Sequence, residues 1–145
     1  MANKQYTIIK SSGKLDTYSE YDLIESPAIV SLKNVENKGL ICVGAWVKYI
    51  TVDNSGNKIT CISVQDANTG DVFSGQSVTF RESFEDIVDR VSDMEEVSDM
   101  FFIEVLHRTS KSGRDYLNCA LVSPDRALAR MGYPEKNIPM PEPQK

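Results

Sequence analysis

The residues best suited to binding a ligand lie in the stretch from His107 to Tyr116, which carries three cations and one aromatic ring. The cations are Arg108, Lys111 and Arg114, and they are interspersed with Ser, Thr and Gly residues typical of a hairpin turn. Cations can neutralise the phosphates of a nucleic-acid backbone, and a flat side chain can stack on an unpaired base for about 1–3 kcal/mol. This combination favours a surface that binds single-stranded nucleic acid.

Further cations and aromatic residues fall in neighbouring strand-like runs, and we assign them to the same candidate surface. They are Trp46, Lys48, Tyr49, Lys58, Phe73 and Arg81. Two alternatives stay open, because large aromatic side chains are usually buried. Trp46 is as consistent with packing against a terminal segment as with stacking on a base, and Phe73 is favoured as a core residue.

The pattern does not indicate catalysis. The chain has a single histidine, no cysteine cluster with zinc spacing, and neither a glycine-rich phosphate loop nor a nucleophile elbow. Glu85 and Asp89 lie one turn apart on an expected helix face, where nothing predicts the burial that acid–base chemistry requires. We therefore expect no enzymatic activity, no cofactor and no metal.

Length and composition indicate one cytosolic domain. The 145 residues are enough to bury a core, and no run is long and apolar enough for a signal peptide or a membrane span. Three cysteines, Cys42, Cys61 and Cys119, lie inside strand-like runs and are expected to be reduced core residues.

The elements that must position the candidate surface follow a definite order after Lys38. The expected elements are three strands at Gly39–Val52, Lys58–Gln65 and Val72–Phe80, a helix around Ser83–Val91, and a hairpin of Phe101–Arg108 and Asp115–Val122. Five strands with one helix between the third and the fourth is the order of a mainly β OB-fold barrel. The face and loops of that fold bind oligonucleotides or oligosaccharides.

The alternation of side chains predicts which face of each strand is buried, and capping and periodicity predict the start and the apolar side of the helix. In the first strand we expect Ile41, Val43, Ala45 and Val47 to face the interior, and Trp46 and Lys48 to face outward. In the last strand, Tyr116 should point away from Leu117 and Cys119. Ser83 is expected to cap the helix, whose apolar stripe consists of Phe84, Ile87, Val88 and Val91.

The charge is unevenly distributed. The net charge is −5, yet eight of the 21 acidic residues and one of the 16 bases lie between Glu82 and Asp99, which leaves 13 acidic and 15 basic residues elsewhere. The acidic run is expected to be a solvated helix face. Because fields are screened over about 10 Å, it need not prevent a basic groove on another side.

The ends of the chain differ from this core. Residues 1–36 are expected to form an arm, residues 37–122 the barrel, and residues 123–145 a short helix followed by a proline-rich tail. The arm is too apolar for a linker and lacks a regular period, so it should dock either on its own barrel or on a neighbouring copy. Its contact residues would be Tyr6, Ile8, Ile9, Tyr18, Tyr21 and Leu23.

The stretch from Lys38 to Val122, with its Lys-Ser-Gly-Arg-Asp-Tyr-Leu hairpin at 111–117, resembles the OB-fold single-stranded-DNA-binding proteins encoded by phages and conjugative plasmids of Gram-positive bacteria. The resemblance implies a protein that coats single-stranded DNA without sequence readout during replication or conjugative transfer. From the residues themselves, RNA is an alternative ligand, the arm is expected to mediate self-association, and no membrane is expected to be involved.

Two other functions remain open. The first is an OB-like protein-interaction module of a larger assembly that binds no nucleic acid, which the net acidity favours. The second is an accessory subunit of an enzyme such as a nuclease, which the lack of a catalytic constellation disfavours.

Overall fold

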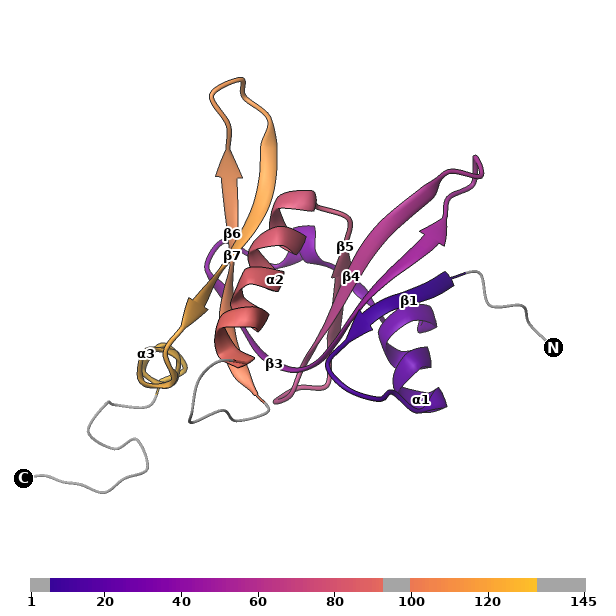
Figure 1. Ribbon diagram of the computed structural model, residues 1–145. Coiled ribbons are helices and arrows are strands. Elements are labelled where there is room, and N and C mark those ends of the chain that lie inside the picture. Colours follow the sequence, from indigo (N-terminus) through magenta and orange to yellow (C-terminus); the bar gives the residue numbers. More distant parts are fainter. Residues whose placement is uncertain (1–5, 93–99, 133–145) are drawn as a thin grey trace, which may run out of the picture.

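The computed structural model of the chain describes residues 6–92 and 100–132 (Figure 1). The proline-rich tail expected at 133–145 lies outside this part of the chain, as do residues 93–99 of the acidic run. The described part is mainly β, as predicted, and its mixed sheet curls halfway into a barrel.

Seven strands make up the sheet in the described part of the chain. They are β1 (Tyr6–Ser11), β2 (Val30–Ser31), β3 (Gly39–Val52), β4 (Lys58–Asp66), β5 (Val72–Gly75), β6 (Phe101–Thr109) and β7 (Asp115–Val122). Their order is β2-β5-β4-β3-β6-β7, and β1 pairs with β3. All pairs are antiparallel except β2–β5. The two strands beyond the predicted five, β1 and β2, come from the segment predicted to be an arm.

The helices are α1 (Thr17–Glu20), a π-helical turn η1 (Tyr21–Glu25), a 3₁₀ turn η2 (Leu32–Asn34), α2 (Val78–Ser92) and α3 (Pro124–Arg130). α3 starts as predicted, because the Ser123 hydroxyl accepts a hydrogen bond from the backbone N–H of Arg126 at 3.3 Å. Pro124 occupies the first turn, where a missing N–H costs nothing.

The turn between β3 and β4 forms where the sequence predicts it. The Asp53 carboxylate accepts hydrogen bonds from the backbone N–H groups of Ser55 and Asn57, each at 2.9 Å. Gly56 adopts a φ of +86°, which residues with a Cβ rarely adopt. Gly70, at φ +81°, serves the turn between β4 and β5 in the same way.

A β-bulge in β3 changes the predicted faces of that strand. The pairing with β4 shifts between Val43 and Ala45, so Gly44 is an extra residue. A side chain at Gly44 would approach the Ala67 Cβ to 3.0 Å. Because faces alternate with a period of two, one extra residue reverses every later side chain. Val43 faces the interior as predicted, but Trp46 does so as well, and Val47 faces the opposite side.

α2 begins earlier than predicted and takes in Phe80, which was expected in a strand. The backbone N–H of Phe80 donates to the Ser77 hydroxyl at 3.2 Å, so Ser77 has the capping role expected of Ser83. Phe80 is fully buried because it lies one turn before Phe84 and extends the apolar stripe. The strand predicted at Val72–Phe80 is therefore shorter in the structure, where β5 ends at Gly75.

Ser83 instead helps to cover the free edge of β7. Its hydroxyl accepts from the backbone N–H of Cys119 at 3.2 Å, and the Thr79 hydroxyl, one turn earlier, donates to the Leu117 carbonyl at 2.6 Å. α2 thus lies in the opening between β7 and the β4–β5 side of the sheet (Figure 1). These contacts satisfy edge groups that would otherwise be open to another strand.

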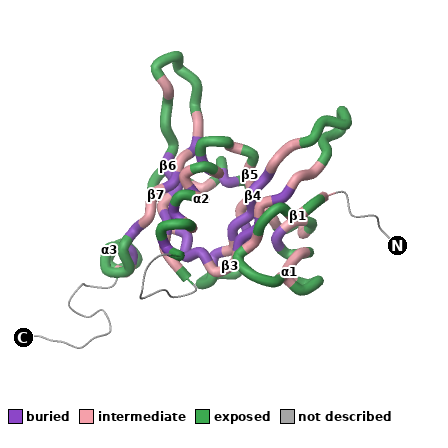
Figure 2. The backbone as a smooth tube through the Cα atoms, in the orientation of Figure 1, coloured by how far each residue is buried: buried purple, intermediate pink, exposed green. Residues whose placement is uncertain are grey.

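Two apolar clusters lie on opposite faces of the sheet, and the buried backbone follows both of them (Figure 2). The inner cluster packs α2 and η2 against β3–β7 and includes Trp46, Phe80, Phe84 and Ile103. The outer cluster packs Leu23 and other residues of the N-terminal segment against Val47, Tyr49, Cys61 and Val72. We call residues 6–31 the N-terminal layer.

Candidate nucleic-acid interface

The β6–β7 hairpin carries the four residues that the sequence singles out first. Arg108 lies directly opposite Tyr116 in the strand register, and the two therefore share a face. Lys111 and Arg114 lie in the turn, where Arg114 is held by hydrogen bonds to Ser110. The three cations are exposed and Tyr116 is half-buried, so the structure brings these residues together in one projecting element.

The charge of this hairpin is available to a ligand. Arg108, Lys111 and Arg114 make no ion pair with any residue of the described ranges. Asp115, the acidic residue beside them, accepts a hydrogen bond from the Thr109 hydroxyl at 3.0 Å. Three cations against one carboxylate leave the hairpin positive, although the whole chain has a net charge of −5.

The base of the hairpin is fixed by the segment before β3. The backbone N–H of His107 donates to the Asn37 side-chain oxygen at 2.9 Å, and the His107 Nε2 lies 2.5 Å from the Val35 carbonyl oxygen. His107, the single histidine, thus has a structural environment of backbone and amide groups. The described part contains no group of three side chains suited to holding a metal ion.

A second hairpin, β3–β4, extends from the same side of the molecule as β6–β7 (Figure 1). Lys58 lies at its tip end, opposite Val52, and both side chains are exposed. The remainder of its turn is built by Asp53 and small polar residues. This hairpin therefore offers one of the predicted cations.

Two of the predicted stacking residues are core residues, so their assignment to the surface is wrong. Trp46 is 5% exposed and packs edge-to-face on Phe84, with ring centroids 5.6 Å apart. Tyr49 is 6% exposed and packs edge-to-face on Tyr6 at 6.2 Å. The bulge at Gly44 causes the error for Trp46. Phe73 is half-buried and packs against the inner cluster, in line with the alternative favoured for it.

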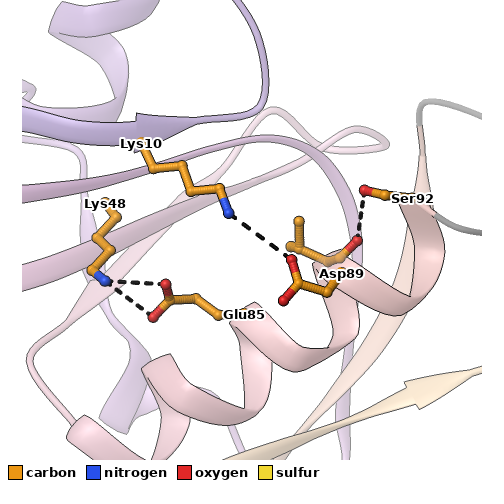
Figure 3. Close-up of polar contacts among 6 residues, drawn as sticks. Lys10, Lys48, Glu85, Asp89 and Ser92 are labelled. Atoms are coloured by element: carbon orange, nitrogen blue, oxygen red, sulfur yellow. Dashed lines mark hydrogen bonds and ion pairs between the residues drawn. The ribbon is translucent and has the colours of Figure 1, made fainter.

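Lys48 and Arg81 are engaged within the fold. The Lys48 ammonium lies 3.0 and 3.2 Å from the two Glu85 carboxylate oxygens, as Figure 3 shows. The Arg81 guanidinium donates to the Thr60 carbonyl at 3.4 Å. The acidic side of α2, expected to be solvated, thus partly faces the cations of the sheet; Asp89 also lies 4.0 Å from the Lys10 ammonium.

The outer face of β4 and β5 is covered by the N-terminal layer, in line with one of the two docking alternatives for this segment. The side chains on this face are uncharged; they are Ile59, Cys61, Ser63, Gln65, Val72 and Ser74. Ser63 is fully buried, and its hydroxyl has no hydrogen-bond partner in the described structure. A face with this composition is a packing surface and offers nothing that would neutralise a phosphate.

The residues expected to contact a neighbouring copy divide into two groups. Leu23, Tyr6 and Ile8 belong to the outer cluster of their own chain, which accounts for their apolar character without a second molecule. Ile9, Tyr18 and Tyr21 are 48%, 83% and 49% exposed. The structure therefore places the arm on its own sheet.

The three cysteines are buried, and burial raises the pKa of each thiol. Burial raises the pKa of the Cys119 thiol to about 11, and a hydrogen bond between this thiol and the Ser83 hydroxyl acts in the opposite direction. Burial also raises the pKa of Cys42 and Cys61. Since the thiolate is the reactive form, these residues are small core side chains, as predicted.

Sequence reasoning missed a second group of cations at the base of β6–β7. The Arg130 guanidinium lies 3.2 Å from the Glu104 carboxylate and also donates to the Lys38 carbonyl. Arg126 is one turn earlier on the same helix and is exposed. The four-residue spacing of Arg126 and Arg130 is visible in the sequence, whereas only the fold brings Lys38 beside Arg130.

Searches of protein-family models, curated proteins and solved structures found no match to this chain. Among the described residues, no helix has the length and apolar character needed to cross a bilayer.

Proposed function

We propose that this protein is an OB-fold single-stranded-DNA-binding protein that coats DNA without reading its sequence, in the replication or conjugative transfer of a plasmid or phage. The observation that carries the proposal is the β6–β7 hairpin, which presents three exposed cations without ion pairs in the described ranges and one half-buried aromatic ring. The link to plasmids and phages comes from the sequence resemblance.

The strand order supports the OB-fold assignment. Strands β5-β4-β3-β6-β7 are neighbours in that order, and α2 lies between β5 and β6 in the chain. An OB barrel has this arrangement, and the loops joining its first two and last two strands contribute to ligand binding. Those loops correspond to the β3–β4 and β6–β7 hairpins, which project from the same side (Figure 1).

The charge distribution favours the hairpins over the sheet face as the surface for the proposed contact. In an OB-fold the face of the second and third strands also binds ligand. Here the corresponding face, on β4 and β5, is uncharged and covered. Arg108, Lys111, Arg114 and Tyr116 therefore carry the proposed function, with Lys58 from the second hairpin.

A salt titration of oligonucleotide binding tests the proposal. The protein should bind a labelled single strand more tightly than a duplex of matched length, because stacking reaches only unpaired bases. Changing Lys111 and Arg114 to Ala should flatten the plot of log K against log salt by up to about 1.4 units, since each phosphate contact on a single strand contributes about 0.7.

The matched control changes Lys14 and Lys33 to Ala. These exposed cations belong to other parts of the surface, and their removal alters the net charge equally. Tyr116→Ala should weaken binding by about 1–3 kcal/mol with little change in slope, because stacking releases no counterions. Tighter binding to the duplex, or no difference between the hairpin and control variants, would refute the proposal.

The alternative is an interaction module that binds protein through the N-terminal layer. The observation that favours it is the exposure of Tyr18 and Tyr21 on a segment that also carries Asp16, Asp22 and Glu25. Such a module would show no oligonucleotide binding at any salt concentration. The same titration therefore separates the two functions.

A further inference from the structure

We infer that a single strand bound at the hairpin tip continues along the outer face of β6–β7 to a second cation cluster formed by Lys38 and Arg126, beside the Arg130–Glu104 ion pair. This inference rests on the proposed function and assigns the path of its ligand. α3 lies at the end of β6–β7 remote from the hairpin tip (Figure 1). The first cluster thus lies at the tip of β6–β7, and the second lies beside the middle of β6, at Glu104 and Val105.

The face between the clusters carries cationic and polar side chains beside one buried apolar residue, Leu106. Strand alternation places Arg108, Tyr116 and Asn118 on the side of the sheet away from Leu117 and Cys119, which belong to the inner cluster. Glu104, the acidic residue on this side, is paired with Arg130 at 3.2 Å. Its charge is therefore compensated where a phosphate would pass.

The backbone at Lys38 is a second, independent observation. Lys38 has a φ of +68°, in the left-handed region, and among the described residues it is the one residue other than glycine with a positive φ. Its N–H donates to the Val105 carbonyl at 2.7 Å, and its carbonyl accepts from Arg130. A glycine would adopt this conformation without strain, yet the position carries an exposed cation next to α3. Such strained positions concentrate at functional sites.

The dimensions fit a short oligonucleotide. Thr109 and Glu104 are five residues apart on β6, which corresponds to about 17 Å at about 3.3 Å per residue. At about 3.4 Å per stacked nucleotide, this length spans about five nucleotides. A strand of about 15 nucleotides can therefore reach both clusters, within the range of about 4–16 nucleotides covered by one OB-fold.

The test compares three double variants of the full chain on a labelled oligothymidylate of about 15 nucleotides. One changes Lys38 and Arg126 to Gln, one changes Lys111 and Arg114 to Gln, and the control changes Lys14 and Lys33 to Gln. Glutamine removes the charge and keeps an unbranched polar side chain at each position. Thermal unfolding of each variant verifies that the fold is retained.

The inference predicts that the Lys38/Arg126 variant loses up to about 1.4 units of salt slope, as the hairpin variant does, while the control keeps the wild-type slope. If the hairpin variant loses slope and the Lys38/Arg126 variant behaves as the control, the path is wrong and the proposed function stands. If the wild-type protein does not bind the oligonucleotide, the proposed function itself fails. If polyglutamate binds as well and depends on the same cations, the surface recognises acidic protein, which overturns the inference.

Discussion

Replacing Leu23 with Ala tests whether the N-terminal layer belongs to its own barrel. Leu23 is 1% exposed and packs in the outer cluster with Val47, Tyr49, Cys61 and Val72. Truncation of a fully buried leucine removes its apolar contacts and leaves a cavity, at a cost of about 3 kcal/mol within a usual range of about 2–5. For a chain of this length each kcal/mol corresponds to about 3 °C, so Tm should fall by about 10 °C.

Ile9→Ala is the matched control within the same layer. Ile9 lies at the irregularity in the β1–β3 pairing and is 48% exposed. Substitutions at exposed positions usually change stability by about 0.5 kcal/mol or less. Urea and thermal unfolding, followed by circular dichroism, should therefore distinguish the two aliphatic residues. Equal losses at both positions would contradict the packing described for the outer cluster.

Protein concentration distinguishes a layer packed on its own chain from an arm exchanged between copies. Unfolding of a monomer is independent of concentration, whereas the Tm of an exchanged dimer rises with it. We expect the wild-type Tm to stay constant over a hundredfold range of concentration. A rise in Tm that Leu23→Ala abolishes would refute the packing argument and return the arm to its predicted role between copies.

Three further results are expected. In a double-mutant cycle of Lys48→Met and Glu85→Gln, the coupling should be about 0.5–1 kcal/mol and should weaken in about 1 M salt, because the pair is partly exposed. Since the pKa of Cys119 is raised to about 11, the folded state keeps this proton more tightly than the unfolded chain. The free energy of unfolding should therefore be highest below about pH 9 and fall by about 2 kcal/mol by pH 11, and Cys119→Ala should flatten that fall in urea titrations. Ser83→Ala should cost about 1 kcal/mol because it removes a contact to β7, whereas Ser92→Ala, whose hydroxyl bonds only within α2, should cost less than half of that by the same assay.

Local patterns predicted the features that depend on neighbouring residues in the chain. The hairpin turns with Gly56 and Gly70, the cap of α3 at Ser123 and the stripe of α2 all follow from short-range rules of φ, capping and periodicity. The cationic hairpin was predictable for the same reason. Its residues are brought together by one turn, so no long-range contact is needed to place them.

The sequence by itself determined that this chain is mainly β and that its cations gather on one hairpin, because alternation and turn chemistry act over a few residues. The tertiary structure decided which aromatic residues are buried, since the extra residue at Gly44 reverses β3 and turns Trp46 into the core. It also decided that residues 6–31 cover β4 and β5, because burial of Leu23 depends on strands far away in the chain. The neighbourhood of Lys38 and Arg130 arises in the same way, from a contact across 92 residues that no local pattern encodes.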